Sequence, residues 1–187
     1  MKYGKDFWVI DPVTFERLPL TQPKLHPFAY PDNGSRGFWL LEDFAVEFIF
    51  RGMRWRLIVK GWPVADPEHP RFDFDGASIP QAVWSVIGDP IALDILIPAT
   101  FHDIFFCAHL TAWPLALTNA LFLEMQQACR AAHKKTKAGQ AVSWLRSWGK
   151  RNTTTLFVRA CGWALWKKSD EDMAKYRALI VATPSLA

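Results

Sequence analysis

The order of apolar and polar residues divides the chain into a β half followed by an α half. Apolar side chains occupy every second position over 44–50, and a similar alternation returns over 54–60. A period of two is typical of a strand with one buried face, and Gly52 stands between the two runs. The pattern therefore predicts an antiparallel hairpin, and we expect a further strand over 37–41 to extend it into a small sheet.

Two stretches interrupt this β region. Residues 20–35 contain several prolines and end in an Asp-Asn-Gly-Ser run, and residues 62–70 are also rich in proline and charge. Such clusters are typical of turns, so we expect loops in both places.

Helical signals dominate after residue 77. Ser78, Pro80 and Gln81 have the pattern of a helix start, with an N-cap serine, a proline in the first turn and glutamine at the third position. The predicted helices cover 78–87, 91–109, 114–132 and 140–168, and a last short helix begins at Asp170. We therefore expect one α+β domain over 1–187, β-rich over 1–75 and mainly helical over 78–182.

The central predicted helices contain an uncharged stretch long enough to be a membrane span. Residues 104–123 contain no Asp, Glu, Lys or Arg, and a stretch of that length can cross a bilayer. His109, Pro114 and Asn119 interrupt it, however, and residues 110–114 resemble a turn between two helices. We therefore expect a buried helical hairpin and no transmembrane span.

Composition narrows the class of protein. Of the 187 residues 50% are hydrophobic, which excludes a disordered chain. The three cysteines form no C-x-x-C pair, so we expect neither a disulfide framework nor a thiolate zinc site. The N-terminus has no long apolar run, so we expect no signal peptide.

Charge is distributed unevenly. The net charge of +4 is the sum of −5 over residues 1–129 and +9 over residues 130–187. The basic part also holds tryptophans on its predicted helices, at positions 144, 148, 163 and 166. Basic helices with tryptophan suit a membrane surface or lipid, a partner protein, or a plain solvated surface. No motif supports nucleic-acid binding.

The expected helical hairpin brings polar residues together. His102 and Asp103 lie about eight residues before the turn, and Asn119 and Phe122 lie about eight residues after it. Antiparallel helices would place these groups opposite one another. Because buried polar groups need partners, the cluster has either a structural or a chemical role.

Asp75 is a second candidate. It precedes Gly76, in a turn that leads into the helix predicted from residue 78. Its carboxylate suits the capping of backbone N–H groups. A carboxylate beside loop carbonyls also suits calcium, with Asp103 as a second ligand. Both interpretations remain open at this stage.

Several of these residues carry a family resemblance. The run F-D-G-A-S-I-P over 74–80, then His102-Asp103, then Phe122 and Met125, resembles a phage- and prophage-associated family of unknown function. The resemblance covers about residues 62–166. It implies association with a bacteriophage, a location in the host cytoplasm or the virion, and contacts with phage structural proteins.

The two predicted helices also resemble, more distantly, the catalytic helices of phospholipase A(2). That resemblance implies that His102 is the general base for a water and that the residue at Asn119 orients it. It also implies that Asp103 binds calcium, with Asp75 and the carbonyls near Gly76 completing the coordination. The chemistry is coherent, because an imidazole activates water and a divalent cation stabilises an ester oxyanion.

Two positions depart from the phospholipase pattern. Asn119 stands where those enzymes have an aspartate, and Phe106 stands where they have a tyrosine. An amide stabilises an imidazolium much less than a carboxylate does. The sequence thus gives two expectations: a calcium-dependent lipid-ester hydrolase, active or impaired, and a non-catalytic virion, tail or assembly component with the same fold.

Overall fold

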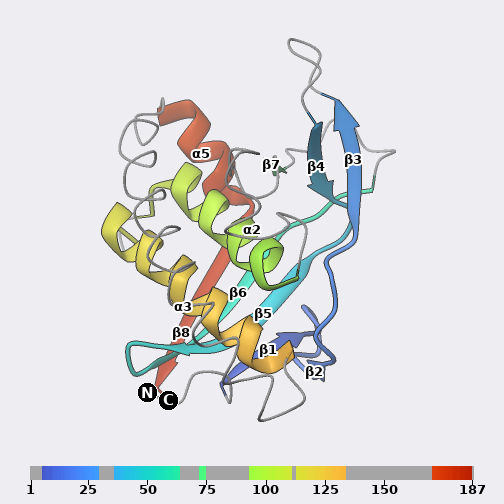
Figure 1. The fold of residues 1–187 in the computed structure, drawn as a ribbon. Coiled ribbons are helices and arrows are strands. Elements are labelled where there is room, and N and C mark those ends of the chain that lie inside the picture. Colours follow the sequence, from blue (N-terminus) through green and yellow to red (C-terminus); the bar gives the residue numbers. More distant parts are fainter. Residues whose placement is uncertain are drawn as a thin grey trace, which may run out of the picture.

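Two antiparallel sheets and three helices make up the described part of the chain in the computed structural model (Figure 1). The structure describes residues 6–29, 36–63, 72–74, 93–110, 113–133 and 170–186. Strands come first and helices follow, so the α+β class predicted from the sequence is confirmed. The strands are β1 (Phe7–Ile10), β2 (Arg17–Leu18), β3 (Leu25–Ala29), β4 (Arg36–Leu40), β5 (Phe44–Phe50), β6 (Met53–Val59), β7 (Asp73–Phe74) and β8 (Ile180–Leu186). The helices are α2 (Leu93–Ala108), α3 (Leu115–His133) and α5 (Asp170–Ala178).

The predicted hairpin is present as β5 and β6. Phe50 pairs with Met53, so the connection consists of Arg51 and Gly52 alone. Both residues have positive φ, 52° and 79° respectively. Two such residues make a type I′ turn, whose twist matches that of antiparallel strands. Glycine adopts this conformation freely, whereas Arg51 is strained in it.

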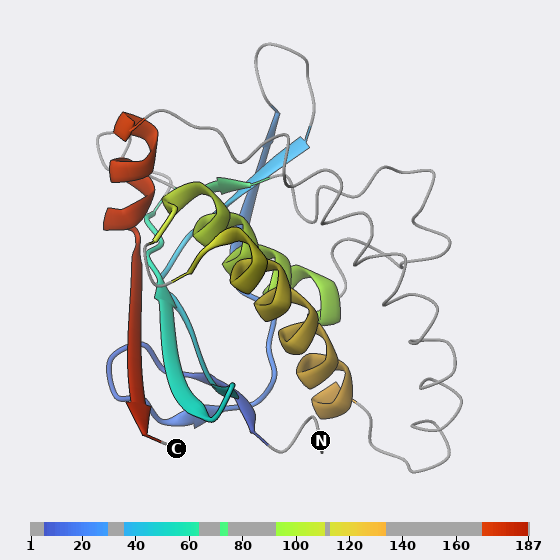
Figure 2. The same ribbon diagram turned by 90° about the vertical axis from the view of Figure 1, so that its left-hand side faces the viewer.

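The hairpin register sorts side chains onto the two faces of a five-stranded sheet with the order β2-β1-β5-β6-β8. The helices α2 and α3 lie along one face, as Figure 2 shows. Phe44 of β5 packs there against Phe101 of α2, with 6.1 Å between ring centroids. Glu47 and Arg56, which pair across the two strands, alternate with the core residues and project to the opposite face.

The further strand expected over 37–41 is present as β4, but it belongs to a second sheet with the order β3-β4-β7. The end of β6 is tied to this sheet. The Trp62 N–H donates to the Leu40 carbonyl at 3.0 Å, and the Gly61 N–H donates to the Asp43 carboxylate at 3.1 Å. These bonds define the junction between the two sheets.

The prediction of a loop over 20–35 is wrong for residues 25–29, which form β3. Pro27 pairs with Phe38 of β4, and β3 lies at the edge of its sheet. A proline is tolerated on an edge strand because its missing N–H has no ladder partner to lose. His26 stacks on Trp39 with 4.4 Å between ring centroids, which adds a cross-strand contact.

The predicted helical hairpin is present as α2 and α3, whose bounds agree with the expected ranges 91–109 and 114–132. The two helices pack side by side in both views (Figures 1 and 2). Among the described helices, none combines the length and the apolar content that crossing a bilayer requires.

Trp113 fills the space beneath the turn of this hairpin. Its indole is buried and lies 4.6 Å from Trp55, 4.9 Å from Phe105 and 5.5 Å from Phe50, measured between ring centroids. These contacts join β5 and β6 to α2, so one tryptophan connects the sheet to the helices. The Thr118 hydroxyl donates to the Trp113 carbonyl at 3.2 Å and fixes the start of α3.

The C-terminal part differs from the prediction of helix up to residue 182. The short helix expected at Asp170 is present as α5, but Ile180–Leu186 form β8, which pairs with β6 along its length. Pro184 sits on this edge strand, and its presence hid the strand from the sequence pattern. The Arg177 side chain of α5 donates to the carbonyls of Ala108 and His109, at the end of α2.

Several predictions fall outside the described residues. They are the helices over 78–87 and 140–168, most of the loop over 62–70, and the basic tryptophan-bearing surface. The candidate residues Asp75 and Gly76 also lie there. Of the three cysteines, Cys107 is partly buried and Cys129 is buried, whereas Cys161 lies outside the described residues.

Candidate functional site

His102 lies at the centre of the helical hairpin and contacts an oxygen at each ring nitrogen. Its Nδ1 is 3.0 Å from Oδ1 of Asp103, and its Nε2 is 3.0 Å from Oδ1 of Asn119. Asp103 follows His102 on α2, whereas Asn119 comes from α3, 17 positions later. The structure therefore brings His102 and Asn119 together as the spacing predicts.

Two phenylalanines form the walls around the imidazole. Phe106 stacks on the His102 ring with 5.8 Å between centroids, and Phe122 meets the ring edge-on at 5.3 Å. Phe106 occupies the position at which the phospholipase pattern has a tyrosine, so its ring supplies packing but no hydroxyl. Asn119 and Phe122 are buried, so the site lies in an apolar environment.

The two oxygen contacts restrict the proton positions on His102. An ionised Asp103 only accepts hydrogen bonds, so Nδ1 donates to it. With Oδ1 of Asn119 facing Nε2, the second nitrogen is placed to donate to it. A neutral ring fits the same positions when the Asn119 amide turns and its NH₂ group donates to Nε2.

Activation of water needs a different arrangement of these groups. The Nε2–H would donate to Asn119 Oδ1, as its position allows, and Nδ1 would present its lone pair to a water. Asp103 Oδ1 now stands at 3.0 Å from that nitrogen. Asp103 must therefore leave Nδ1 before His102 can act as a base, and its carboxylate is partly exposed, which gives it somewhere to turn.

The calcium expectation rests on one described ligand. Asp103 supplies a carboxylate, and the other predicted ligands, Asp75 and Gly76, are outside the described residues. Within the described ranges, no group of three or more His, Cys, Asp or Glu side chains is arranged to hold a metal ion. Calcium takes six to eight oxygen ligands, so Asp103 alone does not make a calcium site.

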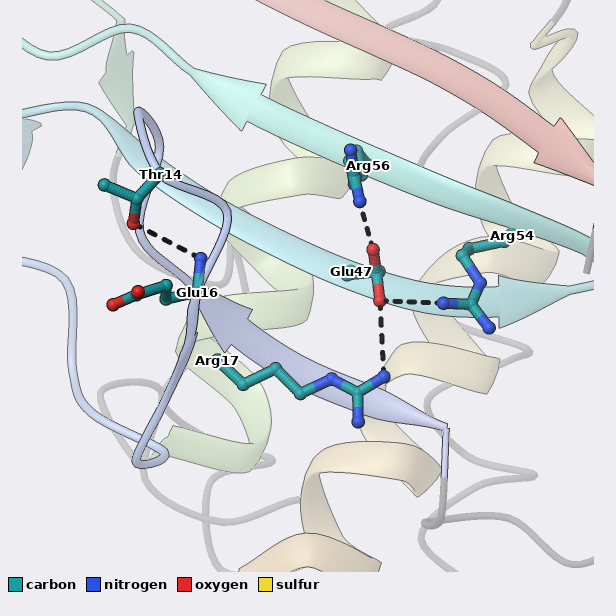
Figure 3. A network of polar contacts seen from close by, with 6 residues as sticks. All are labelled: Thr14, Glu16, Arg17, Glu47, Arg54 and Arg56. Atoms are coloured by element: carbon teal, nitrogen blue, oxygen red, sulfur yellow. Dashed lines mark hydrogen bonds and ion pairs between the residues drawn. The ribbon is translucent and has the colours of Figure 1, made fainter.

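A second polar cluster, on the other face of the sheet, was not predicted from the sequence. The Glu47 carboxylate is 2.9 Å from Nε of Arg56, 3.4 Å from Arg54 and 3.6 Å from Arg17 (Figure 3). The hairpin register alone places Glu47 opposite Arg56, so that pair was foreseeable. Arg17 reaches the cluster only because β2 pairs with β1, and no local signal indicates this.

Comparison of the chain with family models, with curated proteins and with solved structures finds no match.

Proposed function

We propose that the chain is a phage-associated hydrolase of lipid esters in which His102 activates water. The observation that carries this proposal is the contact of His102 Nε2 with Asn119 across two antiparallel helices. With Nε2 held from the facing helix, Nδ1 can exchange a proton with water once the Asp103 carboxylate has turned away from it, which is the arrangement that the phospholipase resemblance implies. The phage context and the lipid substrate are supported by the sequence resemblances.

In the proposed reaction, His102 Nδ1 takes a proton from water while Nε2–H donates to Asn119. The water oxygen bonds to the ester carbonyl carbon, the ester C–O bond breaks, and the imidazolium returns its proton to the leaving alkoxide. Asn119 holds the ring in the required tautomer, and Phe106 and Phe122 limit its rotation. Calcium, in the proposal held by Asp75, Gly76 and Asp103, would stabilise the oxyanion.

A second candidate function is a non-catalytic virion, tail or assembly component. The observation that favours it is the contact of Asp103 with Nδ1, because both ring nitrogens are then satisfied by the protein. In that case the Asp103-His102-Asn119 series fastens α2 to α3 in the apolar interior, as buried polar groups with complete hydrogen bonds do.

Ester hydrolysis distinguishes the two functions. The protein is assayed on phospholipid vesicles and on a soluble short-chain ester, with added calcium. The hydrolase predicts a rate that His102→Gln abolishes and that Asn119→Asp raises by about tenfold or more, because a carboxylate stabilises the imidazolium. Background rates for both the wild type and Asn119→Asp would contradict the hydrolase and leave the non-catalytic function as the remaining candidate.

Calcium is tested separately by calorimetric titration of the whole chain. Asp103→Ala and Asp75→Asn should each abolish or strongly weaken binding, because calcium sites depend on the number of charged ligands. Lys24→Gln, which changes an exposed side chain outside the site, is the control. An unchanged calcium affinity in Asp103→Ala would remove Asp103 from the metal site.

A further inference from the structure

The cluster around Glu47 lies on the sheet face opposite α2 and α3, apart from the proposed hydrolase site. Three guanidinium groups surround one carboxylate, so these four side chains carry a surplus of positive charge. The Glu47 side chain is 5% exposed, whereas those of Arg17, Arg54 and Arg56 are 51%, 35% and 43% exposed. The arginines therefore satisfy the buried carboxylate and still present N–H groups to solvent.

Aromatic rings hold two of the three arginines in place. The guanidinium of Arg17 lies 3.6 Å from the centroid of the Trp8 ring, and that of Arg56 lies 4.7 Å from the Phe15 ring. Stacking and the contacts to Glu47 together fix the planes of these groups. Side chains that are ordered beforehand lose less entropy when they bind a ligand.

The loop between β1 and β2 adjoins the arginines and exposes two apolar side chains. Oδ1 of Asp11 accepts hydrogen bonds from the backbone N–H groups of Val13, at 2.8 Å, and Thr14, at 2.7 Å. These bonds hold the loop in shape and lower the pKa of Asp11. Val13 at the tip is 81% exposed, and the partly exposed Phe15 has a φ of 60°. A strained aromatic residue on a fixed, exposed loop is a feature that occurs at binding sites.

We propose that this surface, the arginine face, docks an acidic segment of a partner protein that carries apolar side chains among its carboxylates. The arginine face consists of Arg17, Arg54 and Arg56 around Glu47, with Val13 and Phe15 beside them. Arginine forks pair with carboxylates in two-point contacts, and arginine is frequent among the residues that dominate interface energies. Two carboxylates adjoin the arginine face: that of Asp11 accepts backbone hydrogen bonds within its own loop, and that of Glu16 points away from the cluster (Figure 3).

The same observations disfavour a nucleic acid as the ligand of the arginine face. Single strands bind by stacking bases on exposed rings. Here the Trp8 ring is covered by Arg17, and the Phe15 ring has Arg56 over it. Val13 offers an aliphatic surface that a phosphate backbone does not use, whereas a leucine or valine of a protein partner would bury it.

The test measures binding of a synthetic peptide in which glutamates alternate with leucines. Arg17→Gln removes the longest of the three contacts to Glu47 and leaves Arg54 and Arg56 in place, so the fold should persist. Val13→Ser removes the exposed apolar tip. Lys24→Gln is the matched control, because it removes one exposed positive charge before β3, outside the arginine face.

We expect Arg17→Gln and Val13→Ser each to weaken peptide binding by about tenfold, while Lys24→Gln leaves it unchanged. Glu47→Gln should tighten binding several-fold, because it removes the negative charge that competes for the arginines while the glutamine oxygen still accepts a hydrogen bond that orders them. If the cluster only stabilises the fold, Glu47→Gln should not tighten peptide binding.

Three results would overturn the proposal. One is an affinity for the Glu-Leu peptide that neither Arg17→Gln nor Val13→Ser changes. Another is the absence of binding at millimolar peptide. The third is tighter binding of oligothymidylate than of the peptide, which would make the arginine face a nucleic-acid site.

Discussion

At the scale of single residues, Glu124 on α3 shows how burial changes the behaviour of a charge. Partial burial raises the pKa of its carboxyl group, and Arg51 opposes that effect. The folded state then holds this proton to higher pH than the unfolded chain does. Stability therefore falls as pH rises from the ordinary glutamate value of 4.5 to the raised pKa, and stays constant above it.

Glu124→Gln removes this loss of stability with rising pH, because a glutamine side chain does not titrate. We expect the variant to gain stability relative to the wild type between about pH 4 and about pH 7, by at most about 1 kcal/mol because the group is partly solvated. Urea unfolding at both pH values measures the gain. Arg51→Gln removes the cation that lowers the pKa of Glu124, so the total loss of stability with rising pH should be larger in this variant than in the wild type. If Glu124→Gln stabilises the protein equally at both pH values, the titration of Glu124 is not the cause of the pH dependence.

The meeting of His102 with Asn119 was predictable, because the distance of each residue from a turn fixes what faces it. The position of the Asp103 carboxylate was not. A residue next to His102 on a helix usually points to another side, and only the folded side-chain geometry shows that it reaches Nδ1. That one contact separates the two candidate functions.

At the scale of elements, the turn between β5 and β6 contains an avoidable strain. Arg51 has a left-handed backbone, which is unfavourable for a residue with a Cβ. Arg51→Asn should stabilise the protein by about 0.5–1 kcal/mol, because Asn-Gly is the preferred sequence of a type I′ turn. Thermal unfolding measures the change, and a fall in stability would show that the contacts of Arg51 outweigh its strain.

The end of α2 depends on a side chain from α5. Nε of Arg177 donates to the Ala108 carbonyl at 2.7 Å, and a second nitrogen donates to the His109 carbonyl at 3.2 Å. The last carbonyls of an α-helix point beyond it, so Arg177 supplies donors at this end, and its positive charge interacts favourably with the helix dipole.

Arg177→Gln should therefore lower the free energy of unfolding by about 1–2 kcal/mol in denaturant titrations. Lys175→Gln removes the same charge from the same helix without touching α2, and should change stability by less than about 0.5 kcal/mol. Equal losses in the two variants would show that charge on α5, and not the capping of α2, is responsible.

Edge strands mark the limit of what the pattern predicts about elements. The central strands β5 and β6 alternate clearly and were predicted. The edge strands β3 and β8 contain Pro27 and Pro184, which are typical of loops in a local analysis. A sheet tolerates them because an edge strand leaves some N–H positions unused, and that position in the sheet is a long-range property.

At the scale of the whole molecule, Gly61 lies where the two sheets meet. A Cβ at this position would clash with the Glu42 backbone, and the adjoining Trp62 N–H donates across the junction. Gly61→Ala should therefore destabilise the protein by at least about 2 kcal/mol. Gly52→Ala is the control, because a Cβ there meets nothing within 4 Å and the loss of about 1–2 kcal/mol reflects backbone conformation alone.

Calorimetric unfolding distinguishes the two glycines further. The clash at Gly61 should be relieved only by separation of the sheets, so its transition should broaden or divide. The Gly52 variant should keep a single sharp transition. If Gly61→Ala destabilises the protein no more than a substitution at the surface does, the two sheets are not held together at this point.

The pairing of β8 with β6 also sets the order in which the chain can fold. Ile180 pairs with Val59, more than a hundred residues earlier in the chain. Closing so long a loop is entropically costly and slow, so β6 waits as an open edge while the hairpin and the helices form. An open edge accepts any complementary strand, including β8 of a second copy. Slow pairing of β8, relative to encounters between chains, would therefore favour a strand-exchanged dimer over the monomer.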